Sequence, residues 1–247
     1  MGKYRKLIWL SFVLLCQSCH TYYRPQQLAY TDYTISAAAP KDSDLHRLLQ
    51  PYADTVNSRM NAIVGYCRDN LEKARPNFSL GNFMADAMLV MGTQHFATQI
   101  DAAFVNYGGV RLEQLPVGPV TRSKIFELMP FDNILVIQQL KGAVLMKLLD
   151  YIAGQNGWPL AGITMKIRDH KAFDILIGGK PLNPDATYVI ANSDFVVNGG
   201  EIGNMLKGIP VANNGYLVRD ALFDYIGWLQ QQGRDITITE KRIHYAE

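Results

Sequence analysis

Residues 106–111 read Asn-Tyr-Gly-Gly-Val-Arg and directly follow residues 102–105, Ala-Ala-Phe-Val, a short apolar run that predicts a buried strand. Two glycines after a strand allow the backbone to approach a ligand closely. Arg111 adds a planar, permanently charged donor group beside them. The segment therefore predicts a binding loop at the end of a strand, although taken alone it is more simply explained as a tight turn.

Three other segments combine the same kinds of residue. Residues 80–88 (Leu-Gly-Asn-Phe-Met-Ala-Asp-Ala-Met) place a glycine and a polar pair where a helix is expected to open. Residues 130–133 (Pro-Phe-Asp-Asn) predict a turn before a strand, and residues 194–201 (Asp-Phe-Val-Val-Asn-Gly-Gly-Glu) predict a strand that runs into glycines. Phe131 and Phe195 can hold a flat ring between them, and nearby Asn and acidic side chains can bond ribose hydroxyls. Each segment alone is better explained by turns and core packing.

Together, the four segments resemble the C-terminal domain of the 5′-nucleotidase family, in the same order and with similar spacing. The family pattern is approximately L-G-N-x-x-x-D-A, then N-x-G-G-[IV]-R, then P-[FY]-x-N, then a Phe six residues before the acid of G-G-D-G. The resemblance covers about residues 43–243. It implies an α+β fold of four layers, α/β/β/α, with mixed sheets, in which two aromatic side chains sandwich the base of a nucleoside or nucleoside monophosphate.

The resemblance implies a substrate-binding role for nine residues of this chain. Phe131 and Phe195 are the expected stacking pair. The other seven are expected to contact the base, the ribose or the phosphate side, or to let the backbone approach them: Arg75, Asn106, Gly108, Gly109, Arg111, Asn133 and Glu201. Glu201 stands where the family has Asp, and Ile202 follows it. The longer carboxylate can still reach a ribose.

In the full-length family, hydrolysis belongs to an N-terminal metallophosphatase domain with two metals held by D-x-H, G-N-H-[DE] and G-H-x-H motifs. The histidines of this chain are scattered: His20, His46, His95, His170 and His244. Asp44-Leu45-His46 matches D-x-H, but Ser43 or Asp44 is more simply the N-cap of a helix. We therefore expect no metal, cofactor or catalytic residue in this chain, and divalent metals only in a partner metallophosphatase.

Three functions are compatible with these features. The chain is expected to be the nucleoside- or nucleotide-binding half of a split 5′-nucleotidase in nucleotide catabolism, with the metallophosphatase on a separate chain. A free-standing nucleoside-binding lipoprotein and a non-catalytic scaffold are the alternatives. The sequence has no G-x-S-x-G motif, and Cys67 has no evident histidine partner. Cys67 occupies an apolar position of a helical pattern, where a buried, inert thiol is expected.

The composition is that of a folded globular protein, with 48% hydrophobic and 19% charged residues. The formal net charge is +2, but three of the 24 basic residues lie in the first 18 positions, which leaves 21 basic against 22 acidic residues. A near-neutral chain with scattered charges has no electrostatic footprint for nucleic acid. Nucleic acid is therefore not an expected partner.

The N-terminus has the features of a targeting segment. Lys3, Arg5 and Lys6 precede the apolar run 7–15, which is shorter than the roughly 20 residues that span a bilayer. The following segment, Cys16-Gln17-Ser18-Cys19, resembles a bacterial lipobox, with Cys16 where the pattern prefers Leu. The alternative is an ordinary secretory signal with two incidental cysteines.

The lipobox resemblance implies cleavage before Cys19 and acylation of its thiol. The expected organisation is a lipoprotein signal peptide at 1–18, a tether at 19–41 and one domain at 42–247. The protein is then expected to be anchored by lipid to a membrane of the bacterial cell envelope, in the periplasm or at the outer membrane.

Hydrophobic periodicity predicts the other elements. Apolar residues at spacings of three and four predict a helix from Ser43 towards Glu72, kinked or divided at Pro51. Gly178-Gly179 predicts a tight turn between two strands. The remaining predicted elements are helices from Ser79, at 141–152 and at 216–231, and strands at 102–105, 134–137, 163–167, 173–177, 188–191 and 236–243. Such a mixture predicts one α+β domain.

Overall fold

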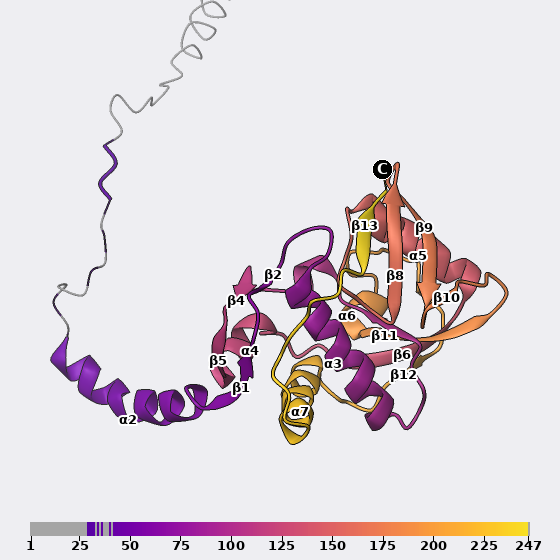
Figure 1. Ribbon diagram of the computed structural model, residues 1–247. Coiled ribbons are helices and arrows are strands. Elements are labelled where there is room, and N and C mark those ends of the chain that lie inside the picture. Colours follow the sequence, from indigo (N-terminus) through magenta and orange to yellow (C-terminus); the bar gives the residue numbers. More distant parts are fainter. Residues whose placement is uncertain (1–28, 33, 35, 37–39, 41, 247) are drawn as a thin grey trace, which may run out of the picture. The chain divides into compact units, whose positions relative to one another are not determined.

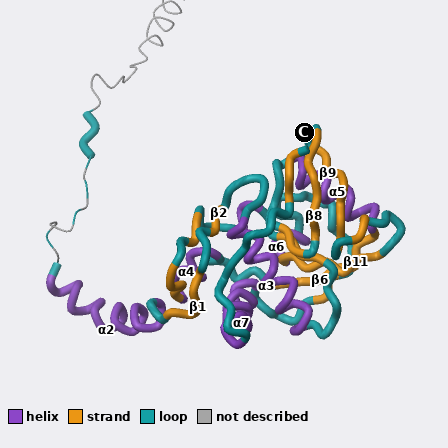
Figure 2. Tube along the Cα trace, in the orientation of Figure 1, coloured by secondary structure: helices purple, strands orange, loops and turns teal. Residues whose placement is uncertain are grey.

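The computed structural model describes residues 29–32, 34, 36, 40 and 42–246. The chain divides after Leu48 into two units, and the second unit contains the sheets (Figure 1). Figure 2 shows helices and strands interleaved within that unit. None of the helices in the described ranges has the length and apolar character needed to cross a membrane. The predicted signal peptide and Cys19 lie outside the described residues, so they stay predictions, as do the domain boundaries.

Helix α2 (Ser43–Met60) is shorter than the sequence predicts. Its predicted continuation to residue 72 is wrong, because strands β1 (Ile63–Cys67) and β2 (Leu71–Glu72) occupy that segment. β1 is rich in β-branched and aromatic residues, which fit a strand. It pairs antiparallel with β5 (Gly118–Thr121), and β2 pairs with β4 (Gln114–Leu115), partners that local periodicity does not reveal.

A five-stranded sheet forms the centre of the second unit. Its strands, in spatial order, are β12 (Val211–Ala212), β6 (Leu135–Lys141), β11 (Thr187–Ser193), β3 (Ala102–Phe104) and β7 (Leu160–Ala161). β11 runs parallel to β3 and antiparallel to β6, so the sheet is mixed, as predicted.

Helices α3 (Ser79–His95) and α7 (Val218–Gln231) pack against each other beside this sheet (Figure 1). α3 also packs on β3, β7 and β11. Apolar residues of both helices join Ala103, Leu135 and Ala191 of the sheet region in one buried cluster. The helices predicted from Ser79 and at 216–231 are confirmed.

A four-stranded sheet and helix α5 (Gly142–Gly154) build a second buried cluster. The strands, in spatial order, are β10 (Lys180–Pro181), β9 (Lys171–Ile177), β8 (Ile163–Arg168) and β13 (Ile243–Tyr245). Every second residue of β8 is buried, and these side chains meet α5 and the residues Phe104 and Ile190 of the five-stranded sheet. The α+β class is confirmed, and α3 with α7, the two sheets and α5 supply the elements of the expected α/β/β/α arrangement.

Two details, at residues 178–181 and 236–243, differ from prediction. Gly178 and Gly179 turn as predicted, with φ angles of +54° and +78°, but they join β9 to the short β10, which was not predicted. The predicted strand at 236–243 is wrong over most of its length. Ile236 forms only an isolated bridge with Cys67, which is buried as predicted, although on a strand and not a helix.

The strand directions bring the predicted binding segments together. Because β3 and β11 are parallel, their C-terminal ends lie at the same edge of the sheet, and residues 106–111 and 194–201 follow those ends. β6 is antiparallel to β11, with Leu135 opposite Ser193, so residues 130–133 lie just before β6 at that same edge. The carboxyl ends of parallel strands are a common place for ligands to bind.

Candidate functional site

A pocket of about 260 Å³ opens at this edge of the five-stranded sheet. It is lined by eight of the nine residues predicted from the sequence: Asn106, Gly108, Gly109, Arg111, Phe131, Asn133, Phe195 and Glu201. Arg75 does not line this pocket, and its guanidinium carbon lies 4.4 Å from the centroid of the Tyr107 ring. The fold thus gathers residues from three separate loops, whose roles toward a ligand stay predictions.

The Glu201 carboxylate closes one side of the pocket. Its Oε1 accepts hydrogen bonds from the Asn106 amide at 2.7 Å and from the backbone N–H of Gly108 at 3.1 Å. Glu201 has a φ of +62°, a left-handed conformation that is uncommon for residues other than glycine. The Tyr151 hydroxyl on α5 donates to the backbone carbonyl of Glu201 and so supports this conformation.

The two glycines are required by how closely their loop approaches its neighbours. A Cβ atom on Gly108 would lie 2.5 Å from Oε1 of Glu201, and one on Gly109 would lie 2.8 Å from Oδ1 of Asn106. Gly109 is buried in the short 3-10 helix η1 (Tyr107–Gly109). The glycines therefore make room for the polar side chains of the site, in addition to turning the chain.

Phe131 and Arg111 form another wall. Phe131 lies in the predicted turn before β6, and the residue is 40% exposed. The guanidinium carbon of Arg111 lies 5.7 Å from the centroid of the Phe131 ring, within the range of a cation–π contact. Arg111 also donates from Nη1 to the carbonyl of Gly108 at 3.4 Å. Arg111 thereby connects the glycine loop to the Phe131 turn.

Phe195 lies on the short helix α6 (Asp194–Val197) and not on a strand as predicted, because β11 ends at Ser193. The Ser193 hydroxyl caps this helix by accepting a hydrogen bond from the backbone N–H of Val196. Phe195 is 45% exposed, and its ring lies so close to Gly200 that a Cβ there would be 2.3 Å from a ring carbon. The absence of a side chain at Gly200 therefore sets where the ring can lie.

Three residues that the sequence did not indicate hold this site in place. Oδ1 of Asp194 accepts from the backbone N–H groups of Ile134 and Phe195, both at 2.9 Å. Arg219 on α7 donates to the carbonyl of Phe131, which lies 88 positions earlier in the chain. Tyr151 donates to the carbonyl of Glu201, which lies 50 positions later. Asp194 precedes a stacking residue and was a usable signal, whereas the long-range pairs leave no trace in the local sequence.

The predicted segment 80–88 does not face the pocket. Asn82 is buried, and its Oδ1 accepts from the backbone N–H of Leu160. Asp86 accepts from the Arg242 guanidinium at 2.7 Å. Burial raises the pKa of Asp86, and the hydrogen bond and charge of Arg242 oppose that shift. Asn82 therefore holds the start of β7 and Asp86 holds the chain just before β13, so both polar side chains bond other parts of the protein.

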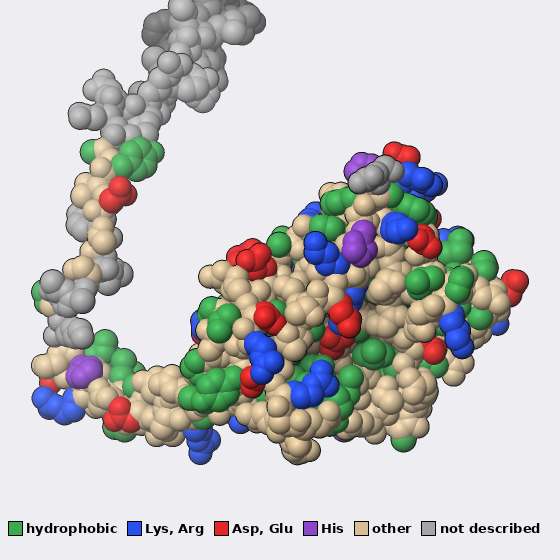
Figure 3. Space-filling model, in the orientation of Figure 1, with side chains coloured by type: hydrophobic (Ala, Val, Ile, Leu, Met, Phe, Trp, Pro, Cys, Tyr) green, Lys and Arg blue, Asp and Glu red, His purple; other side chains and the backbone are tan. Residues whose placement is uncertain are grey.

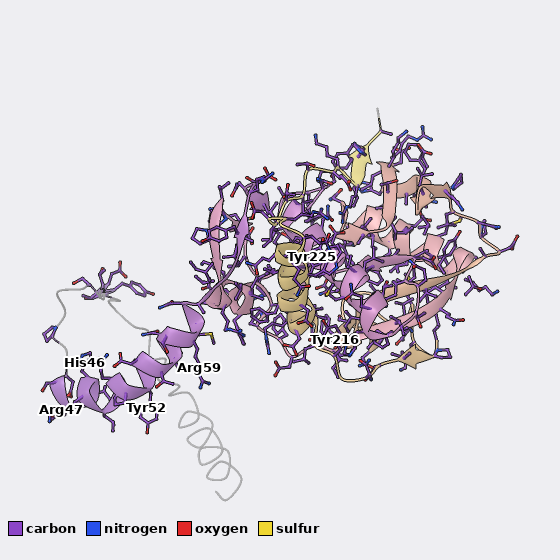
Figure 4. All side chains as sticks on the ribbon, turned by 60° about the horizontal axis from the view of Figure 1, so that its bottom comes forward. His46, Arg47, Tyr52, Arg59, Tyr216 and Tyr225 are labelled. Carbon is purple, nitrogen blue, oxygen red and sulfur yellow. The ribbon has the colours of Figure 1, made fainter. Side chains whose placement is uncertain are left out.

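The D-x-H match on α2 also has a structural explanation. His46 and Asp44 are exposed on that helix, where Figure 4 marks His46. The cap is Asp42 and not Ser43 or Asp44, because its carboxylate accepts from the backbone N–H groups of Asp44 and Leu45. These bonds lower the pKa of Asp42.

Among the described residues, metal-binding side chains do not gather in the way that a metal centre needs. Across the described ranges of the chain, no three His, Cys, Asp or Glu side chains lie close enough together to hold a metal ion. On the face shown in Figure 3, acidic and basic side chains are interspersed. The described residues therefore do not fit the two-metal centre that the 5′-nucleotidase resemblance assigns to a hydrolytic domain.

Residues 61–208 match the family model described as "5′-nucleotidase, C-terminal domain". The chain is similar to the 5′-nucleotidase of Vibrio cholerae, with 27% identity over 192 residues that cover 75% of this chain and 34% of the relative. It is also similar to protein UshA of Escherichia coli, with 25% identity over 187 residues, 72% of this chain and 33% of the relative. This chain therefore spans about a third of the length of these curated relatives.

Solved structures share the fold. The 5′-nucleotidase precursor of Thermus thermophilus superposes with a TM-score of 0.70 and 24% identity, over 85% of this chain and 44% of that one. The NAD nucleotidase of Haemophilus influenzae superposes with a TM-score of 0.59 and 16% identity, over 83% of this chain and 42% of that one. At these identities the likeness concerns the fold alone.

Proposed function

This chain belongs to the family of the 5′-nucleotidase C-terminal domain, and from that membership we propose that its pocket binds a nucleoside or nucleoside monophosphate. In this proposal the chain is the substrate-binding half of a split 5′-nucleotidase that acts in nucleotide catabolism. A separate metallophosphatase chain supplies the divalent metals and carries out the hydrolysis.

One observation carries the proposal: two phenylalanines, one from the turn before β6 and one from α6, line the same pocket, and each is only partly covered. Phe131 is 40% exposed and Phe195 is 45% exposed. When a flat ring covers aromatic rings that are accessible in a pocket, the stacking contacts stabilise the complex. A nucleobase supplies such a ring, and its stacking depends little on which base it is.

Polar groups around the two rings suit a ribose. Asn133 lines the pocket beside the Phe131 turn, and Arg111 uses only one of its N–H groups on the Gly108 carbonyl among the described contacts. Glu201 presents a carboxylate, which accepts hydrogen bonds from hydroxyl groups. We assign these three side chains to the ribose and the phosphate side of the ligand.

Hydrolysis is assigned to a partner because the described residues of this chain do not fit a metal centre. Phosphate ester hydrolysis by two metals needs several carboxylates and imidazoles that converge on them. The lipid anchor at Cys19 belongs to the same proposal, and it would hold this half at a membrane of the cell envelope. Without a partner, the chain is expected to bind substrate and not to turn it over.

The affinity of the chain alone is expected to be weak. Stacking contributes roughly 1–3 kcal/mol per aromatic contact, so two rings give about 2–6 kcal/mol. A dissociation constant of about 1 mM already requires about 4 kcal/mol. Because the proposal places the metals on the partner chain, we expect a Kd on the order of 0.1 to several mM, with adenosine and its monophosphate binding about equally well.

The test is a calorimetric titration of the protein with adenosine up to several millimolar, with the Phe131→Ala plus Phe195→Ala double variant beside it. Saturable heat in the unchanged protein that disappears in the double variant supports the proposal. Phe173→Ala is the matched control, because Phe173 lies on β9, away from the pocket-lining residues, against Arg168. Equal binding by the double variant would show that the two rings do not hold the base.

A further inference from the structure

The turn that carries Phe131 is held by a residue from a distant part of the chain. Arg219 on α7 donates from Nη1 to the carbonyls of Met129 and Phe131, at 3.3 and 3.1 Å. Its Nη2 donates to the Asp132 carboxylate at 2.5 Å. One guanidinium therefore bonds three acceptors along residues 129–132, the segment from which the aromatic ring projects.

The surroundings of Arg219 favour fixed hydrogen bonds. The Arg219 side chain is 11% exposed, whereas that of Asp132 is 79% exposed. The guanidinium carbon lies 4.5 Å from the centroid of the Phe126 ring, so an aromatic face covers the charge. A guanidinium holds its five N–H donors in fixed directions in one plane, which an ammonium group does not. The three acceptors are therefore held at fixed positions.

The second ring is held by different contacts. Oδ1 of Asp194 accepts from the backbone N–H groups of Phe195 and Ile134, and the backbone N–H of Asp194 donates to the Ile134 carbonyl at 2.9 Å. Ile134 follows directly on the Phe131 turn. Asp194 thus fixes Phe195 to one end of the turn, while Arg219 fixes the other end.

We propose that Arg219 is a positioning residue for the stacking of a nucleobase. It does not line the pocket, so it acts through Phe131, whose ring it sets at the separation from Phe195 that a flat ligand needs. The proposal rests on the proposed function, because it concerns the same two rings. It adds that the grip of α7 on the turn determines the affinity for the base.

A fluorescent nucleoside tests this without catalysis. The emission of 2-aminopurine riboside falls when its base stacks on another ring, so the emission of the bound nucleoside, extrapolated from a protein titration, reports the geometry of stacking separately from affinity. We expect Arg219→Gln to raise the Kd about tenfold and to weaken the quenching of the bound nucleoside. Arg219→Lys is expected to restore little, since one ammonium does not bond all three acceptors in one plane.

Two further variants complete the design. Asp132→Asn keeps the two carbonyl bonds and removes the charge pair, so its Kd is expected to rise by only about twofold to threefold. Arg122→Gln is the matched control, because that guanidinium lies 4.6 Å from the Phe223 ring and not at the turn. It is expected to leave both the Kd and the quenching unchanged.

These measurements distinguish three cases: a variant that does not fold, an Arg219 that has no positioning role, and a pocket that does not bind a nucleoside. Thermal melting identifies any variant that does not fold, and Arg219→Lys and Asp132→Asn then carry the test. Quenching and Kd that match the unchanged protein in every folded Arg219 variant overturn the proposal, even if Phe131→Ala abolishes binding. If the unchanged protein does not quench the nucleoside at all, the proposed function fails, and the positioning role fails with it.

Discussion

Glu201 occupies the position where the 5′-nucleotidase pattern has aspartate, and the extra methylene group is accommodated by the neighbouring glycine loop. Its carboxylate reaches both the Asn106 amide and the backbone of Gly108. This reach depends on Gly108 having no side chain, because a Cβ there would lie 2.5 Å from the carboxylate oxygen. The acid and the glycine therefore form one unit of the pocket wall.

Gly108→Ala is accordingly expected to weaken adenosine binding by about tenfold, since the methyl group displaces the end of the Glu201 side chain. The unfolding midpoint is expected to change little, because the displaced atom ends a flexible side chain and Gly108 does not need a positive φ. Calorimetry and thermal melting measure the two effects.

Gly227→Ala serves as the control for that substitution. A Cβ at Gly227 meets nothing within 4 Å, and the residue lies inside α7, so the change is expected to stabilise the protein by about 0.5–1 kcal/mol without affecting binding. An adenosine Kd that stays the same in Gly108→Ala would contradict the role given to the glycine.

At the scale of elements, α3 and the segment before β13 are joined by a buried ion pair and hydrogen bonds. Arg242 is 8% exposed, and it donates to the Asp86 carboxylate and to the backbone of Leu160. Its own backbone N–H donates to Asn77 at 2.7 Å. The segment before β13 is thus held to α3 by one buried ion pair, while β13 itself pairs, among the described strands, only with β8.

Breaking that pair from one side is expected to be costly. Arg242→Met leaves the Asp86 charge buried without a partner and is expected to lower the free energy of unfolding by about 3 kcal/mol. Adding Asp86→Leu removes the unpaired charge, so the double variant is expected to be more stable than Arg242→Met alone. Urea unfolding of the two single variants and the double variant measures the coupling, and strictly additive losses would contradict it.

At the scale of the whole molecule, two buried clusters are joined through the five-stranded sheet, and α2 belongs to neither of them. No side chain of α2 is buried. A protein that begins at Asn61 is therefore expected to melt within about 2 °C of the longer chain, as measured by circular dichroism. A drop of about 10 °C or more would show that α2 contributes to the stability of the fold.

Alkaline pH is expected to destabilise the whole fold. Burial raises the pKa of Cys67 to about 11 and that of Tyr225 to about 12, and it also raises the pKa of Tyr216, whose hydroxyl bonds Asp224. Figure 4 marks both tyrosines, Tyr216 just before α7 and Tyr225 on it. All three groups stay neutral in the folded protein at pH values where the unfolded chain has begun to ionise.

The direction of this pH effect follows from how many protons the folded and unfolded chains bind. Above about pH 8.5 the unfolded chain loses the thiol proton first, and above about pH 10 the tyrosine protons, so the free energy of unfolding falls as the pH rises. Urea unfolding is expected to show a loss of about 1–3 kcal/mol between about pH 8 and pH 11. Cys67→Ala is expected to reduce the early part of that loss, and an unchanged pH profile in this variant would contradict the role of the thiol.

Much of the candidate site could be predicted from the sequence, because four short segments place unusual residue types in a fixed order. Eight of the nine residues chosen in this way line one pocket. Arg75 lies against Tyr107 and does not line the pocket, so its expected contact with a ligand stays a prediction. The partners of Asn82 and Asp86 could not be predicted, because a buried asparagine and aspartate look the same in sequence whether they bond a ligand or another part of the chain.

The sequence by itself determined the features that depend on neighbouring residues: the helices with a strong apolar period, the glycine loops and the aromatic turn. Tertiary structure alone decided the features that depend on a distant partner. Residues 63–67 have enough helical spacing to continue α2, yet they form a strand because β5 supplies its hydrogen bonds. Arg219 reaches the Phe131 turn for the same reason, since hydrogen bonds between segments far apart in the chain depend on how the chain folds and not on local spacing.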